Sequence, residues 1–233
     1  MKTRDRIGIF DSGLGGLTVM RAIREACPSE NLIYFGDTAR VPYGGKSPET
    51  IIRYSLESAI FLMEQDIKML VIACNTASSY AVDKLKGVFN IPIIDVIEPG
   101  AERATSVTKN GHIGVLGTKA TIQSGAYQKA IHKRLPDAQV YSYACPLFVP
   151  LTEERFLNHP ATELIVKEYL EPLKKAQIDT LLLGCTHYPV LKPLIQKELP
   201  GVQIVDSAST CAERVKKLTT PSDQKGSLQF FVS

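Results

Sequence analysis

The sequence lacks the features that mark several large classes of protein. Lys and Arg total 27 against 24 for Asp and Glu, and no Lys/Arg-rich run occurs, so nothing indicates a nucleic-acid or membrane surface. No apolar run approaches the roughly 18 residues of a membrane span, and residues 1–6 lack the long apolar segment of a signal peptide. We therefore expect a soluble cytoplasmic protein with no nucleic-acid or membrane partner.

The cysteines lack the spacing of a zinc ribbon or a disulfide framework. They are odd in number, widely spaced, and contain no Cys-x-x-Cys pair. In a reducing compartment such residues are either small buried hydrophobic side chains or reactive thiols. We expect no metal. The remaining question is which of the five cysteines carry chemistry: Cys27, Cys74, Cys145, Cys185 or Cys211.

Short apolar runs alternate with longer helix-like segments along the whole chain. Its 233 residues allow one or two domains. Near-continuous apolar strands favour a parallel sheet covered on both faces, so the expected fold class is α/β, doubly wound. The pattern predicts strands at residues 7–10, 32–35, 69–73, 91–96, 113–116, 140–144, 180–183 and 202–205.

Two segments recur at nearly the same offset. Residues 7–13 are similar to residues 113–119, and residues 70–76 are similar to residues 181–187. We infer two similar lobes related by a pseudo-twofold duplication, each with a cysteine at a strand end. Ligands of open α/β sheets bind outside the carboxyl ends of the strands, so facing lobes would place one cysteine on each side of a shared cleft.

The segment Asp-Ser-Gly-Leu-Gly-Gly, residues 11–16, follows the first predicted strand. It is either a glycine-eased turn or a degenerate phosphate-binding loop. The second interpretation is weak, because the glycine spacing is wrong and Asp11 would face a phosphate. Backbone N–H groups at a helix start, together with the Ser12 hydroxyl, suit a carboxylate or a small polar ligand better.

Polar side chains follow both Cys74 and Cys185 directly. A sealed core would not easily accommodate them, and a helix N-terminus lowers the pKa of a thiol, so both cysteines are candidates for chemistry as well as for burial. A zinc site at Cys185 would need further ligands that no nearby spacing supplies. The polar residues are Asn75 and Thr76 after the first cysteine, and Thr186 and His187 after the second.

Three other places carry polar groups with two interpretations each. Thr118 and Thr121 begin a predicted helix, where capping is the ordinary role. Tyr43 lies in a Gly-containing turn, which alone indicates little. Glu153 and Glu154 are either an acidic first turn or a source of a catalytic carboxylate, and the sequence does not choose between them.

Two opposed acid/base groups of the same kind suit the inversion of a stereocentre without a cofactor. One group removes a proton from one face, the other delivers a proton to the opposite face, and the roles exchange in the reverse direction. A hydrolase or transferase needs only one nucleophile. A pyridoxal phosphate enzyme needs a Schiff-base lysine, and no lysine here has a recognisable setting for one.

Together these motifs resemble glutamate racemase, within the aspartate/glutamate racemase superfamily. The match runs from about residue 7 to residue 207 in the family's motif order, and the family's pattern continues for one more helix beyond Ser233. The segments that carry the resemblance are DSGLGG (11–16), PYG (42–44), ACNTA (73–77), CPLFVPL (145–151) and GCTHYP (184–189).

The resemblance implies cofactor-independent interconversion of L- and D-glutamate, which supplies D-glutamate for peptidoglycan and so for cell-wall biogenesis and cell shape. Cys74 would take the proton from the D isomer and Cys185 from the L isomer. Asp11 would assist Cys74, His187 would assist Cys185, and Glu153 would be a further acidic group.

The resemblance also implies a binding set and a division of the chain. One lobe would hold residues 1–97 plus 207–233 and the other residues 98–206, and we expect a homodimer. Alternatives are an aspartate or broader amino-acid racemase, or a non-catalytic protein that binds an amino acid in the same cleft. The residues expected to hold the substrate are Asp11, Ser12, Pro42, Tyr43, Gly44, Asn75, Thr76, Thr118, Thr121, Thr186 and His187.

Overall fold

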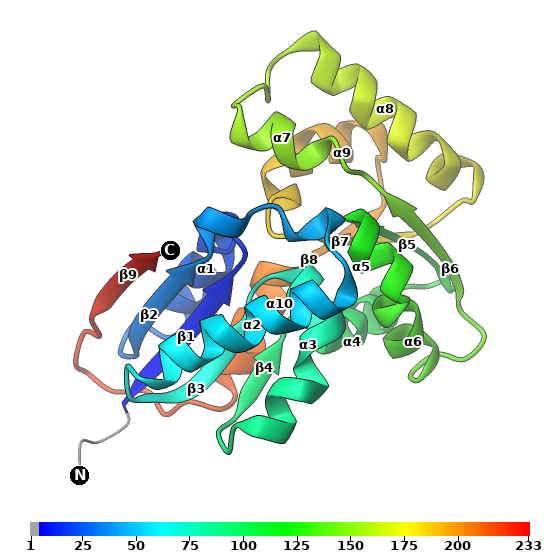
Figure 1. The fold of residues 1–233 in the computed structure, drawn as a ribbon. Coiled ribbons are helices and arrows are strands. Elements are labelled where there is room, and N and C mark those ends of the chain that lie inside the picture. Colours follow the sequence, from blue (N-terminus) through cyan, green and yellow to red (C-terminus); the bar gives the residue numbers. More distant parts are fainter. Residues whose placement is uncertain (1–4) are drawn as a thin grey trace.

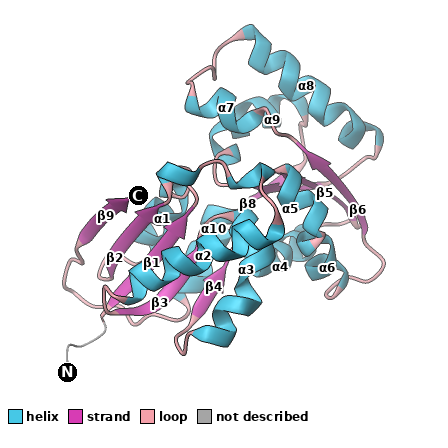
Figure 2. Ribbon diagram, viewed as in Figure 1, coloured by secondary structure: helices cyan, strands magenta, loops and turns pink. Residues whose placement is uncertain are grey.

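The computed structural model describes residues 5–233, which form two β-sheets with helices packed on them (Figure 1 and Figure 2). Residues 1–4 lie outside the described residues, and they belong to the N-terminal segment that lacks the apolar run of a signal peptide. The first sheet has the order β4-β3-β1-β2-β9 and the second β6-β5-β7-β8. The strands are β1 (Arg6–Asp11), β2 (Asn31–Gly36), β3 (Ile67–Ile72), β4 (Ile93–Asp95), β5 (His112–Gly117), β6 (Gln139–Ala144), β7 (Thr180–Gly184), β8 (Gln203–Asp206) and β9 (Leu228–Val232).

The two sheets repeat one strand order. From corresponding edges they run β4-β3-β1-β2 and β8-β7-β5-β6, so β1 corresponds to β5 and β3 to β7. Neighbouring strands pair in parallel in both sheets. The predicted α/β class and the duplication are confirmed, and the predicted strands coincide with β1–β8.

The last strand, β9, was missing from the sequence prediction. It pairs in parallel with β2 and extends the first sheet beyond the repeated unit. Its apolar side chains do not form a buried run, since Leu228, Phe230 and Val232 are largely exposed. Because it is an edge strand, its pairing depends on a partner almost two hundred residues away in the sequence, which local patterning does not reveal.

Helices cover both faces of each sheet, as a doubly wound fold requires. On the first sheet, α1 and α10 pack on one face and α2 and α3 on the other. On the second sheet, α4 and α6 cover one face and α7, α8 and α9 the other. The helices are α1 (Leu17–Ala26), α2 (Pro48–Met63), α3 (Asn75–Val88), α4 (Ile97–Val107), α5 (Lys119–Ser124), α6 (Ala126–His132), α7 (Phe148–Glu153), α8 (Pro160–Lys175), α9 (Lys192–Glu198) and α10 (Ser207–Lys216).

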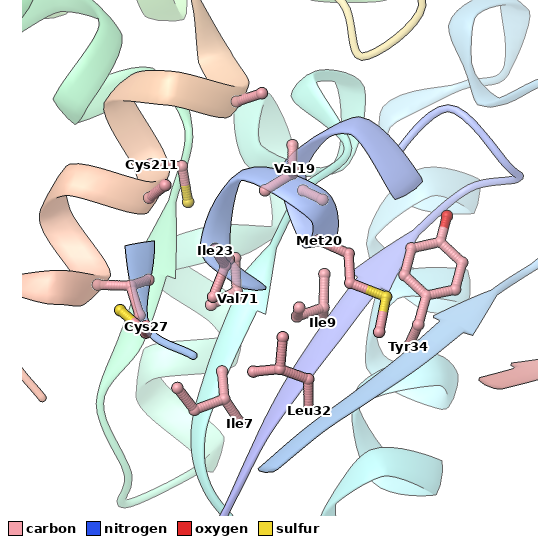
Figure 3. Close-up of a cluster of buried hydrophobic side chains, with 14 of the residues drawn as sticks. Ile7, Ile9, Val19, Met20, Ile23, Cys27, Leu32, Tyr34, Val71 and Cys211 are labelled. Atoms are coloured by element: carbon pink, nitrogen blue, oxygen red, sulfur yellow. The ribbon is translucent and has the colours of Figure 1, made fainter. Parts of the chain in front are cut away.

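All five cysteines are buried in the apolar cores. Cys27 and Cys211 lie among the side chains between α1, α10 and the first sheet (Figure 3). Cys145 is fully buried in the core of the second sheet, and burial raises the pKa of its thiol to about 12. Cys27, Cys145 and Cys211 serve packing, which leaves Cys74 and Cys185, each followed by polar residues, as the candidates for chemistry.

Among residues 5–233, no helix combines the length and the apolar character needed to cross a membrane.

Candidate active site

The carboxyl ends of the two sheets meet at one small cavity of about 40 Å³. Cys74 follows β3 and Cys185 follows β7, which are corresponding strands of the repeated unit. Both cysteines therefore reach the cavity, one from each sheet, as the duplication predicts. The lining residues are Ser12, Gly13, Val41, Pro42, Tyr43, Gly44, Cys74, Asn75, Thr76, Thr118, Val149, Glu153, Cys185, Thr186 and His187.

Every residue expected at the site lies on this cavity or directly behind it. Asp11 and Thr121 are the two that do not line it. Both are buried behind its wall, where Asp11 accepts the backbone N–H of Gly13 at 3.0 Å and Thr121 contacts Thr118. The roles given to all these residues remain predictions.

A wider recess of about 450 Å³ adjoins the small cavity and shares part of its wall, including Glu153 and His187. Much of its remaining wall is apolar, with Leu14, Val41 and Val190 exposed there. The recess therefore lies beside the small cavity on the side of Glu153 and His187, and neither Cys74 nor Cys185 lines it.

Cys74 caps the N-terminus of α3. Its Sγ accepts the N–H of Ala77 at 3.4 Å and lies 3.3 Å from the Ser12 hydroxyl, to which it donates. Burial, with a smaller effect of the negative charge of Asp11, raises the pKa of Cys74 to about 11. The expectation that the helix N-terminus would lower this pKa is wrong, because desolvation of the thiolate outweighs the one N–H that the helix offers.

Cys185 stands at the head of a chain of three side chains. Its Sγ lies 3.7 Å from Nδ1 of His187, and Nε2 of His187 lies 3.0 Å from Oε1 of Glu153. Burial raises the pKa of the Cys185 thiol well above its ordinary value. The carboxylate beside His187 belongs to Glu153 and not to Glu154. The sequence alone did not indicate which of the two glutamates would lie there.

The carboxylate of Asp11 is fully buried and half satisfied. Oδ2 accepts the N–H of Gly13, whereas Oδ1 has no hydrogen-bond partner within residues 5–233. Burial raises the pKa of Asp11, against the opposing pull of His187 and of backbone N–H groups. A buried oxygen without a donor costs about 1–3 kcal/mol, so this oxygen is well placed to receive a donor from a ligand.

Three threonine hydroxyls form a closed triangle on the other side of the cavity. The Oγ1 atoms of Thr76 and Thr118 are 2.9 Å apart, those of Thr76 and Thr121 3.2 Å, and those of Thr118 and Thr121 3.0 Å. Thr118 also caps α5 by accepting the N–H of Thr121. Each hydroxyl has one hydrogen, so binding a carboxylate would require one hydroxyl to turn out of the triangle, while Thr118 can still cap α5 through a lone pair.

Tyr43 lies on the cavity wall but uses its hydroxyl elsewhere. That hydroxyl donates to the buried carboxylate of Asp37, which also accepts Nε of Arg40 at 2.9 and 2.8 Å. The segment of Tyr43 therefore offers its ring and backbone to the cavity. Sequence reasoning missed Asp37, although it directly follows β2 and Asp11 ends the neighbouring β1, and the carboxyl ends of neighbouring parallel strands lie at one sheet edge.

Several polar residues line the cavity, but among residues 5–233 no fixed cation does. Over the part of the chain that the structure describes, no Lys or Arg side chain lines it. In the same residues, no group of three or more His, Cys, Asp or Glu side chains is arranged to hold a metal ion. Hydroxyl, amide and backbone N–H groups are the donors available to a bound carboxylate.

Comparison with known proteins gives consistent matches over most of the chain. The profile of the Asp/Glu/Hydantoin racemase family matches residues 7–215. Curated glutamate racemases of Geobacter metallireducens and Persephonella marina are 52% and 54% identical, each alignment covering 97% of this chain and 87% of the relative.

Solved structures agree with the sequence matches. A glutamate racemase of Bacillus anthracis superposes with a TM-score of 0.95 at 41% identity, over 99% of this chain and 89% of that one. A glutamate racemase of Francisella tularensis in complex with D-glutamate gives a TM-score of 0.90 at 40% identity, over 98% and 88%. The aspartate racemase of Picrophilus torridus, with a TM-score of 0.64 at 19% identity, shares the fold.

Proposed function

The chain belongs to the Asp/Glu/Hydantoin racemase family, and from this premise we propose that it interconverts L- and D-glutamate with Cys74 and Cys185 as the two acid/base groups. The D-glutamate formed would supply peptidoglycan synthesis. The proposal rests on one observation above all: corresponding strands of the two duplicated sheets deliver one thiol each to the same small cavity.

Each turnover moves one proton off the α-carbon and another onto it. From L-glutamate, the Cys185 thiolate takes the α-proton and the Cys74 thiol gives its proton to the opposite face. The reaction leaves Cys185 as thiol and Cys74 as thiolate, which is the arrangement needed for D-glutamate. Similar groups on both faces are what a reversible inversion requires.

The first thiolate must be formed in the site, because burial raises the pKa of both thiols. Glu153 accepts the Nε2–H of His187, which leaves Nδ1 free to take the proton of Cys185. When the lobes separate and the wall in front of Asp11 opens, the substrate ammonium would donate to its unpartnered Oδ1. This contact offsets the negative charge that helps to keep Cys74 protonated.

Neutral donors would hold the two carboxylates of the substrate. The available groups are the threonine triangle, the Asn75 amide, the Thr186 hydroxyl and backbone N–H groups of the residue 11–16 loop. Such donors can turn or shift between the two isomers, whereas a fixed ammonium or guanidinium would favour one carboxylate position.

Access of glutamate requires the lobes to separate. The cavity of about 40 Å³ is close to the ~30 Å³ share of one water molecule in the liquid, far less than glutamate needs. We propose that residues 1–97 plus 207–233 move relative to residues 98–206. Contacts that such motion would break include the Thr18 hydroxyl to the Thr186 carbonyl, 3.1 Å, and the Tyr80 hydroxyl to the Ala120 carbonyl, 2.9 Å.

Incubation of the protein with L-glutamate in D₂O, free of added metal and pyridoxal phosphate, tests the proposal. We expect optical activity to decay and deuterium to appear at the α-carbon of the D isomer, followed by circular dichroism and proton NMR. L-Aspartate should turn over far more slowly. Binding of glutamate without any loss of the α-proton would instead support the non-catalytic alternative, and faster turnover of aspartate would change the substrate.

A further inference from the structure

Tyr127 is buried between the two cysteine-bearing strand ends although it lines neither cavity nor recess. It lies on α6 of the second lobe, and its hydroxyl donates to Oδ1 of Asn75 on α3 of the first lobe at 2.6 Å. Asn75 directly follows Cys74 and lines the cavity. The hydroxyl of Tyr127 therefore crosses the lobes to a residue of the site.

The amide of Asn75 is oriented by two partners. Tyr127 donates to its oxygen, and its Nδ2 donates to the Ser207 hydroxyl at 3.3 Å. An amide nitrogen has two hydrogens, and Ser207 takes one, so the other is available to a carboxylate in the cavity. The opposite orientation would turn the amide oxygen toward that carboxylate, which repels it.

The ring of Tyr127 supports the other strand end. It packs against Gly184, the residue before Cys185, so closely that a methyl group there would lie 2.9 Å from Cε2. On its other side a methyl group at Gly100 of α4 would lie 3.2 Å from Cε1. The Tyr127 side chain thus packs against the end of β7 and is hydrogen-bonded to the first residue of α3.

We propose that Tyr127 is a positioning residue, which sets the Asn75 amide to donate to a substrate carboxylate and keeps the two cysteine-bearing strand ends in register. This inference rests on the proposed function, because it assumes that a carboxylate enters the cavity. It assigns Tyr127 an effect on substrate binding that is transmitted through Asn75, without contact to the reacting atoms.

Tyr127→Phe keeps the ring and removes the hydroxyl. We expect KM to rise about tenfold for both glutamate isomers, with kcat changed less than about threefold, because a ground-state contact is lost. Tyr141→Phe is the control, since it also removes a tyrosine hydroxyl, on β6 and outside both the cavity and the recess. It should leave KM unchanged.

A double-mutant cycle shows whether the effect travels through the amide. In an Asn75→Ala background, Tyr127→Phe should change KM less than about twofold, because the group it orients is gone. An additive rise in that background, a loss confined to kcat, or an equal rise from Tyr141→Phe would overturn the proposal. If Tyr127→Phe does not fold, as judged by circular dichroism, Ser207→Ala replaces it in the same cycle.

Titration calorimetry of glutamate separates this inference from the proposed function. A wild-type protein that binds glutamate without racemising it would overturn the proposed function, and the cycle would then be judged on Kd with the same expectations. A wild-type protein that binds no glutamate would overturn both proposals.

Discussion

Gly15 of the first lobe lies directly against the imidazole of His187 in the second. A methyl group at position 15 would lie 2.5 Å from Cε1 and 2.6 Å from Nδ1 of that ring, and 2.5 Å from the Thr186 hydroxyl. The Cys185 loop therefore reaches its place only because the facing residue has no side chain. Closure of the cleft and placement of the proposed proton carrier depend on the same glycine.

Gly15→Ala should for this reason reduce turnover more than it reduces stability. Displacing His187 by about an ångström is expected to lower kcat by about 10- to 100-fold, measured as racemisation of L-glutamate. Gly87→Ala is the control, because among the described residues its added methyl group meets no atom within 4 Å apart from its chain neighbours and the adjacent backbone of α3. An unchanged kcat in Gly15→Ala would show that His187 does not need its present position.

Replacing either strand-end thiol should abolish racemisation. Cys74→Ser and Cys185→Ser each remove one of the two proposed bases, and a serine hydroxyl is a far weaker acid, so we expect a loss of at least about 10³-fold in kcat. Cys145→Ala controls for loss of a buried thiol away from the cavity and should retain most activity. Substantial turnover in either serine variant would contradict the two-thiol mechanism.

The titration of Cys74 gives a pH dependence with a definite sign. With the pKa of Cys74 at about 11, its thiolate fraction should rise about tenfold per pH unit between about pH 7 and pH 9. Alkylation of Cys74 by iodoacetamide, followed by mass spectrometry in the Cys185→Ser variant, measures this rise. Buried Cys145 in the same digest should stay unlabelled.

Asp11→Asn should shift that profile to lower pH. Removal of the Asp11 charge removes one cause of the raised pKa of Cys74, so labelling at a given pH should be several-fold faster. If the alkylation rate of Cys74 levels off below pH 8 when Asp11 is present, its pKa is not raised. If Asp11→Asn moves the pH dependence of that rate to higher pH, the charge of Asp11 is not a cause of the raised pKa.

Asp37→Asn should weaken both the fold and substrate binding. Asp37 is fully buried and accepts from Arg40 and Tyr43, so the change turns an amide N–H₂ toward one of these donors and should cost about 1–3 kcal/mol in free energy of unfolding. Chemical denaturation measures that loss. Glu25→Gln, which breaks the exposed pair with Arg21, should cost about 0–1 kcal/mol. Equal losses would show that Asp37 is no anchor for the Tyr43 segment.

The sequence and the structure agree most closely where residues are near each other in the chain. The start of α2 was predictable because Ser47, Pro48 and Glu49 carry the capping signal, and the Ser47 hydroxyl accepts the N–H of Thr50. The end of the sheet was not predictable, because β9 is defined by its pairing with β2. The protonation of Cys74 was also misjudged, since burial and not helix position controls it.

By itself the sequence determined the α/β alternation, the duplication, the family resemblance and the residues expected at the cleft, because periodicity and motif order are properties of the chain. Tertiary structure alone decided how those residues meet: Gly15 against His187, Glu153 rather than Glu154 beside it, Asp37 behind Tyr43, and Tyr127 beneath both strand ends. Contacts between lobes depend on packing, burial and desolvation, which join residues far apart in sequence and leave no local pattern.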